Sequence, residues 1–212
     1  MALACSSGSE YDDVAGGIAS ISFTALPYDA NGGLEVEEAW VSIGWLELGP
    51  CSNDYGSIGE ENWPANLLFD PPSRLDFGTG VLDYCAILLE LRPSPSDSTP
   101  LEGLTAFVHG TRADGAPVVI ETRSALDVNV AGPSFNVSNV ALGFDLATWL
   151  ADVDVDAAEL DAEGVARIDE AHNRELQSAF EAGLVRAPSV YQDYDRDGRV
   201  DEDELTPVAT PE

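Results

Sequence analysis

The side chains of this chain that could bind a metal ion are concentrated near its C-terminus. Three carboxylates alternate with other residues at Asp193, Asp195 and Asp197, and two more follow at Asp201 and Glu204. Carboxylates this close repel one another strongly unless a cation lies between them. Calcium prefers six to eight hard oxygen ligands at about 2.3–2.6 Å, which such a series can supply. The spacing therefore favours a cation site over a solvated acidic tail.

The segment Asp193–Glu204 resembles the twelve-residue calcium loop of EF-hand proteins. That loop takes oxygen ligands at its first, third, fifth, seventh, ninth and twelfth positions. The resemblance implies a backbone carbonyl from the seventh position, a water-mediated ligand at the ninth and a bidentate glutamate at the twelfth. The implied ligand set is Asp193, Asp195, Asp197, Arg199, Asp201 and Glu204, with Ca²⁺ as the bound ion.

Two further positions of the loop agree with this resemblance, but its flanks depart from it. Gly198 stands where the chain turns sharply, and Val200 stands at the aliphatic position that packs inward. Pro188 and Pro207 limit any helix before and after the loop. The segment is thus more similar to the isolated calcium loops of extracellular bacterial modules, including dockerins, than to paired sensor hands. This similarity implies a structural staple.

A second acidic run begins at Asp152, Asp154 and Asp156 and has Glu163 at the twelfth position. Ala157 occupies the place where the loop needs glycine. We therefore expect this run to lead into a capped helix and not to bind calcium.

Of the three cysteines, Cys5 has a distinct setting. The preceding Ala2-Leu3-Ala4 and the following Ser6–Ser9 make it resemble the lipobox of bacterial lipoproteins, in which the cysteine is acylated. Only four residues precede Cys5, whereas a signal peptide needs a positive region and an apolar region of about 7–15 residues. We expect a lipid anchor at Cys5, with most of the signal missing from the sequence.

Cys51 and Cys85 remain as a pair if Cys5 is acylated. Cys51 ends one apolar strand-like run and Cys85 lies in another, so neighbouring strands could bring them within bonding distance. An oxidising compartment would then allow a disulfide. Two separate buried thiols are the alternative.

Composition narrows the class of partner. The chain has 212 residues, of which 44% are hydrophobic, so it can bury a sizeable core. Its 39 acidic and 9 basic residues give a net charge of −30, and every basic residue is arginine. Such a polyanion repels nucleic acid and anionic lipid. No run of eighteen apolar residues predicts a membrane span, so membrane contact is expected only through the lipid anchor.

The elements that must position the acidic loop are mainly strands. β-branched and aromatic residues, partly in alternation, predict strands at Ile18–Leu26, Leu34–Leu48, Val81–Leu91, Leu104–Val108, Val118–Glu121, Leu126–Val130 and Phe135–Phe144. Pro, Asn, Asp and Gly predict a long loop over residues 50–66. The series favours an antiparallel β-sandwich of immunoglobulin-like type, and a barrel is the alternative.

The pattern changes to helical after Phe144. Asp145 can cap a short helix through Leu150, and Asp161 can cap a longer one that ends at Gly183. The expected organisation is a tether over 1–16, a β-sandwich over 17–146, and a helical extension with the calcium loop over 147–212, packed on the sandwich.

No catalytic motif appears in the sequence. His109 and His172 are the only histidines, and we expect one at a strand end and the other on the apolar face of the long helix. The sequence therefore predicts a non-catalytic, calcium-binding lipoprotein of the bacterial cell envelope that binds a protein or a glycan.

Two other functions stay open. A strand-rich region followed by a short Asp-Leu helix and a later Asn-containing helix resembles the periplasmic copper-binding proteins linked to methanobactin uptake. Two histidines and no methionine beyond Met1 leave few soft ligands for copper, however. A hydrolase that uses two carboxylates is the other alternative.

Overall fold

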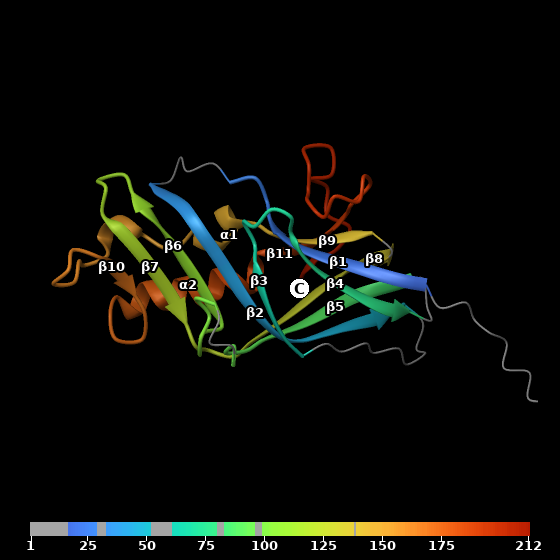
Figure 1. The fold of residues 1–212 in the computed structure, drawn as a ribbon, viewed down its shortest axis with the longest axis horizontal. Helices are drawn as coiled ribbons and strands as arrows, with labels where there is room; N and C mark the ends of the chain where they lie inside the picture. The colour runs from blue at the N-terminus through green and yellow to red at the C-terminus, as the bar shows by residue number, and fades with distance from the viewer. Residues whose placement is uncertain (1–16, 29–32, 52–60, 80–82, 96–98, 138) are drawn as a thin grey trace, which may run out of the picture.

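The computed structural model describes residues 17–28, 33–51, 61–79, 83–95, 99–137 and 139–212 (Figure 1). The predicted tether and Cys5 lie outside these ranges. The described chain is mainly β, as predicted, with strands β1 (Gly17–Ala25), β2 (Leu34–Pro50), β3 (Glu61–Asn66), β4 (Ser73–Thr79), β5 (Asp83–Leu91), β6 (Ala106–Arg112), β7 (Pro117–Thr122), β8 (Leu126–Asn136), β9 (Val140–Phe144), β10 (Ala166–Ile168), β11 (Pro188–Gln192) and β12 (Thr210–Pro211).

The described strands form two sheets, and most of their pairs are antiparallel. The small sheet has the order β11-β9-β1-β4, and the large sheet has the order β10-β7-β6-β2-β5-β8-β12, with β3 also paired to β2. The β1–β9 and β10–β7 pairs are parallel. Antiparallel pairing is what the short spacing between predicted strands requires, because a hairpin needs only a few connecting residues.

The long strand β2 organises the large sheet. Val41 pairs with Ala106 of β6 and with Ala65 of β3, while Ile43 pairs with Leu91 of β5 and again with β3. A strand has only two edges, so β6 and β5 lie end to end along one edge of β2 and β3 lies along the other. Figure 1 shows this division, with β6 and β7 at one end of β2 and β5 and β8 at the other.

Both sheets and both helices contribute side chains to one hydrophobic core. Ile21 and Phe23 of the small sheet belong to the same buried cluster as Leu46 and Ile87 of the large sheet. Phe180, from a helix behind the large sheet, also belongs to it. The C-terminal helical segment is therefore held by the same apolar burial as the strands.

The two α-helices are α1 (Leu146–Leu150) and α2 (Arg174–Arg186), and Val155–Ala157 forms a single 3₁₀ turn. Asp145 caps α1, accepting a hydrogen bond from the Ala147 amide at 3.0 Å, as the sequence predicts. In the described part of the chain, neither helix has the length and apolar composition needed to cross a membrane.

The prediction that Asp161 begins the longer helix is wrong. The Asp161 carboxylate instead accepts hydrogen bonds from the amides of Glu163 and Val165, which closes a tight turn. Gly164 completes that turn at a φ of +80°. The chain then forms β10 beside β7 and begins α2 only at Arg174. Residues 166–168 join the edge of the large sheet instead. Pairing with β7 satisfies backbone N–H and C=O groups, whereas the first N–H groups of a helix would have no partner within the helix.

Gly183 also differs from its predicted role, because it lies inside α2 and does not end it. A Cβ at this position would stand 2.0 Å from the carbonyl oxygen of Trp149. Glycine here lets α2 approach α1 closely enough for the Trp149 and Phe180 rings to stack at 5.0 Å. The residue thus serves helix packing and not helix termination.

Two strands fall outside the predicted series. β3 forms within the predicted loop 50–66, where residues 52–60 lie outside the described part of the chain. β4 contains two charged residues, Arg74 and Asp76, that face away from the core. Its sequence therefore lacks the apolar pattern from which the other strands were predicted. Pairing with β1 supplies the backbone hydrogen bonds that establish it as a strand.

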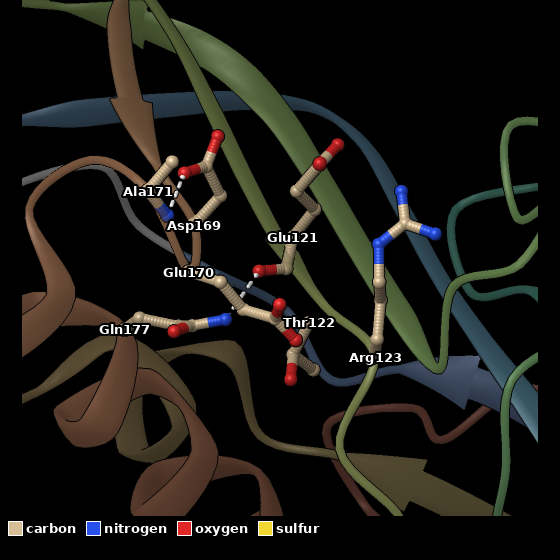
Figure 2. A pocket seen from close by; sticks show the side chains of 7 residues that line it. All are labelled: Glu121, Thr122, Arg123, Asp169, Glu170, Ala171 and Gln177. Atoms are coloured by element: carbon tan, nitrogen blue, oxygen red, sulfur yellow. Dashed lines mark hydrogen bonds between the residues drawn. The ribbon is translucent and has the colours of Figure 1, made fainter.

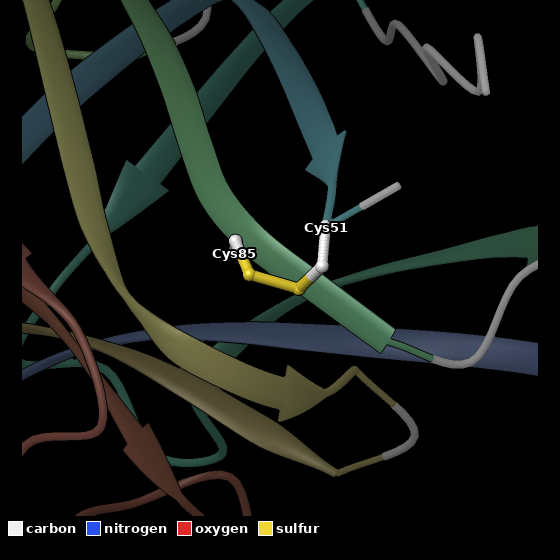
Figure 3. Close-up of a disulfide and its surroundings, with 2 residues drawn as sticks. All are labelled: Cys51 and Cys85. Atoms are coloured by element: carbon white, nitrogen blue, oxygen red, sulfur yellow. A yellow bond between two sulfur atoms is a disulfide. The ribbon is translucent and has the colours of Figure 1, made fainter. Parts of the chain in front are cut away.

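The predicted disulfide between Cys51 and Cys85 is present (Figure 3). It joins the end of β2 to the neighbouring strand β5, with the two Cα atoms 4.9 Å apart. The bond closes a loop with a sequence separation of 34 residues. Chain entropy assigns such a cross-link about 3–4 kcal/mol of stabilisation.

Candidate metal centre

The acidic loop Asp193–Glu204 lies between two short strands that belong to different sheets. β11 before it pairs with β9 of the small sheet, and β12 after it pairs with β8 of the large sheet. The returning chain also pairs directly with β11, because Val190 accepts from the Val208 amide at 2.7 Å and donates to the Ala209 carbonyl at 2.9 Å. Both ends of the loop are therefore fixed, and the loop itself projects from the sheets (Figure 1).

Three carboxylates of the loop are brought together. Oxygen atoms of Asp193, Asp195 and Asp197 all lie within 4.8 Å of one another, a group that could hold a metal ion. Asp193 is buried, whereas Asp195 and Asp197 are exposed. Among the described residues this is the one such group of His, Cys, Asp and Glu side chains.

Backbone amides of the loop point at these carboxylates. Asp193 accepts from the amides of Arg196 at 2.6 Å and Gly198 at 3.0 Å. Asp195 accepts from the Asp197 amide at 3.2 Å, and Asp197 accepts from the Arg199 amide at 2.8 Å. Aspartate readily forms such turns with amides two or three residues ahead. The alternating aspartates thus curl the chain so that their own carboxylates converge.

Glu204 closes the loop from its far end. Its buried carboxylate accepts from the Tyr194 amide at 2.5 Å and from the Asp201 amide at 3.2 Å. The last residue of the segment therefore reaches back beside the first. Neither Glu204 nor Asp201 belongs to the group of oxygen atoms within 4.8 Å.

Gly198, Val200 and Arg199 attach the loop to the rest of the protein. Gly198 has a φ of +86°, and a Cβ there would stand 3.1 Å from the Ser22 hydroxyl oxygen of β1. Val200 is buried against Ala141 and Tyr191. The Arg199 guanidinium pairs with Asp70 at 2.7 Å. The loop is therefore packed on the small sheet and is not a free tail.

Electrostatics in the loop disfavour charge on two of its acids. Burial raises the pKa of Asp193, and the charges of Asp197 and Asp195 raise it further. Desolvation also raises the pKa of Asp201, with added repulsion from Asp197, Asp195, Glu204 and Asp203. Neighbouring anions disfavour an ionised carboxyl in this way, and a bound cation would reverse the effect.

The donor set fits a hard divalent cation. Every side chain in the converging group offers carboxylate oxygen, which suits calcium or magnesium and not a soft metal that prefers thiolate or imidazole. The ordered turns gather these carboxylate oxygens at one place. The assignment of calcium ligands remains a prediction from the sequence.

The second acidic run has other partners. Asp154 caps the 3₁₀ turn by accepting from the Ala157 amide, and Asp152 pairs with Arg186 of α2 at 2.8 Å. Asp156 approaches Arg112 at 3.9 Å. These carboxylates are engaged with separate groups, and the run leads into the Asp161 turn and β10 instead of the capped helix that the sequence predicts.

The two histidines lie at the surface of the sheets and turns. His109 is in β6, within 3.4 Å of Glu37. His172 was expected on an apolar helix face, but it precedes α2, is half-exposed, and contacts the Asp169 carboxylate at 3.0 Å. The difference follows from the later start of α2.

Sequence reasoning did not find a polar hollow between β7 and the start of α2. Figure 2 shows it lined by Glu121, Thr122, Arg123, Asp169, Glu170, Ala171 and Gln177. The Asp169 carboxylate accepts a hydrogen bond from the Ala171 amide at 2.7 Å, and the side chain of the buried Gln177 donates to the Glu121 carbonyl at 3.3 Å. Residues so distant in sequence meet only because β10 pairs with β7, so no local signal could have predicted the hollow.

Comparison with known proteins adds no relative: no family model matches the sequence, and neither curated proteins nor solved structures give a match.

Gly198→Ala should destabilise the protein by about 1–2 kcal/mol or more, because alanine disfavours positive φ and its Cβ would press on Ser22. Gly115→Ala is the matched control, since Gly115 has a φ of +85° and open space around it. Urea unfolding should show the larger loss for Gly198→Ala. Equal losses would contradict the tight packing of the loop on β1.

Asp201→Asn should stabilise the metal-free protein at neutral pH. The folded-state pKa of Asp201 is raised above its usual 3.8, so its charge costs stability at neutral pH. That cost is absent below about pH 3.8 and grows as pH rises through the folded pKa. Thermal melts in chelator should therefore show the gain at pH 7 and none at pH 3. Glu202→Gln removes one charge outside the alternating series and should show a smaller gain; a larger one would contradict the assigned repulsion.

Proposed function

We propose that this chain is a non-catalytic module of the bacterial cell envelope, stabilised by Ca²⁺ at Asp193–Glu204 and anchored by a lipid on Cys5. The observation that carries the proposal is the convergence of the Asp193, Asp195 and Asp197 carboxylates in a loop fixed at both ends. Repulsion between these like charges opposes folding, so a cation bound among them would stabilise the gathered arrangement.

In this proposal each loop residue has a distinct part. The three gathered aspartates supply side-chain oxygens, and Arg199 supplies its backbone carbonyl. Asp201 acts directly or through a water, and Glu204 supplies two oxygens at the end of the loop. Calcium bound there would offset the repulsion that raises the pKa values of Asp193 and Asp201.

The flanking elements support a structural role over a sensory one. An EF-hand sensor works by reorienting the helices on either side of its loop. Here the preceding element is the strand β11, and the chain after the loop returns to pair with Val190. Strands tied into sheets have little freedom to swing, so calcium would act as a staple across the C-terminal segment.

The compartment assigned in this proposal has independent support. The Cys51–Cys85 disulfide is the kind of bond that persists in oxidising compartments such as the periplasm or the cell exterior. The net charge of −30 argues against nucleic acid and anionic lipid as partners, which leaves a protein or a glycan. The scaffold in this proposal is an immunoglobulin-like sandwich, supported by the two mostly antiparallel sheets that share a core.

Isothermal titration and thermal melts test the calcium part. We expect a dissociation constant of roughly 10⁻⁴–10⁻³ M and about 2.7 kcal/mol of stabilisation at a hundredfold excess of calcium over that constant. Asp195→Asn should lose most of the affinity, whereas Glu202→Gln, which removes the same charge outside the ligand set, should keep it. Equal melts in calcium and in chelator would overturn the staple role.

Elemental analysis of the same purified protein separates calcium from copper. Bound copper in stoichiometric amount would favour the copper-binding alternative instead.

Mass spectrometry of the protein isolated from its own cells tests the anchor. We expect Cys5 as the N-terminal residue, carrying a diacylglycerol group, and expect the protein in the membrane fraction. An unmodified cysteine in a soluble protein would contradict the lipid anchor and leave the calcium proposal intact.

A further inference from the structure

A groove of about 330 Å³ runs beside the acidic loop. It is lined by residues from the end of β1, the turn between β3 and β4, the start of α1 and the loop segment 199–201. Its apolar lining includes Leu26, Leu67, Leu68, Phe69, Leu146 and Val200. The volume lies at the lower end of the range for ligand sites and fits one or two side chains.

The turn between β3 and β4 is unusually apolar for a surface turn. Phe69 is 57% exposed and its neighbour Leu68 is 41% exposed. A single exposed apolar residue is ordinary, but two adjacent ones beside an apolar hollow form a patch of the kind that marks interaction sites.

This turn and the acidic loop are joined to each other. The Arg199 guanidinium of the loop pairs with Asp70, the residue after Phe69, at 2.7 Å. Pro72 packs near Gly198, where a Cβ would stand 3.6 Å away. The position of the acidic loop is therefore coupled to the turn that carries Leu68 and Phe69. Arg199 is free to make this contact, because its predicted contribution to calcium is only its backbone carbonyl.

The charge around the groove favours a partner with a net positive charge. The loop carries seven acidic and two basic side chains, a net charge of −5, and one Ca²⁺ would leave −3. Asp201 lines the groove, and the lining arginine, Arg199, is already paired. Such a rim attracts cations and repels anions.

The side chains that line the groove indicate which kind of group on the partner would fit it. Leu68 and Phe69 are its exposed large apolar side chains, whereas Leu67, Leu146 and Val200 are buried, and the Tyr28 hydroxyl donates to the Leu34 carbonyl at 3.3 Å. Such apolar side chains complement an aliphatic side chain better than a polar sugar ring, because a buried hydroxyl without a partner is costly.

We infer that this groove is a calcium-dependent docking site for a basic peptide segment, which places an aliphatic side chain against Leu68 and Phe69 and lysine or arginine against the acidic rim. The inference rests on the proposed calcium function and names the class of partner: a basic protein, in preference to a glycan.

Fluorescence anisotropy with a short labelled peptide of alternating lysine and leucine tests the site in the full chain. We expect binding in calcium that weakens in chelator. Chelation makes the loop more anionic, so purely electrostatic attachment would strengthen instead, and that result would overturn the inference. Peptides of alternating glutamate and leucine, or lysine and serine, should bind at least about tenfold more weakly. Equal binding of either would also overturn it.

Substitutions test whether the peptide binds in this groove. Phe69→Ser should weaken the lysine–leucine peptide about tenfold, whereas Leu160→Ser should not, since Leu160 is 49% exposed but does not line the groove. Asp70→Asn, which breaks the ion pair with Arg199 from outside the calcium loop, should keep the heat of calcium binding and lose the calcium dependence of peptide binding. Equal binding by the Phe69 and Leu160 variants would overturn the site.

Calcium titration of the same samples separates the two proposals. Calcium binding without an effect on the peptide would overturn the docking site alone, and absence of calcium binding would overturn the proposed function. A neutral oligosaccharide that binds in calcium and displaces the peptide would overturn the choice of a basic peptide and favour a glycan.

Discussion

The backbone pairing at Val190 is the constraint on which the C-terminal third of this protein depends. One edge of β11 pairs with β9 in the small sheet, and the other edge receives the chain that returns after the acidic loop. That returning chain continues into β12 and joins the large sheet. A segment that links two sheets through backbone hydrogen bonds cannot shift without breaking pairs in both. The loop between its two arms is therefore held in a defined place.

Within this frame the loop combines strong like-charge repulsion with ordered turns. The Asp193 carboxylate accepts hydrogen bonds from the Arg196 and Gly198 amides, which act to lower its pKa. Burial and mutual repulsion act in the opposite direction at Asp193 and Asp201. These effects oppose each other, and a bound cation would favour the folded arrangement of the loop.

The sequence predicted features that depend on residues close together in the chain. The carboxylate spacing of the acidic loop and the cap at Asp145 each need only a few neighbouring residues. Strongly apolar strands such as β2 and β5 were also predictable, since their alternation and composition persist over many residues. The disulfide was predictable as a possibility, because both cysteines lie in or beside such strands.

Only the tertiary structure decided the features that depend on distant partners. The segment after Asp161 could have capped a helix, but pairing with β7 made it a turn and a strand. From the sequence, Gly183 is predicted to end a helix. In the structure it lies inside α2, where the absence of a side chain allows the close approach of Trp149. Phe69 and Val200 line one groove although they are far apart in the chain, and the ion pair of Asp70 with Arg199 joins their two segments. Which residues could bind a cation was predictable from the sequence, because that chemistry depends on local spacing. Where the loop sits, and what it borders, followed from sheet pairing between segments far apart in the chain, which local patterns do not encode.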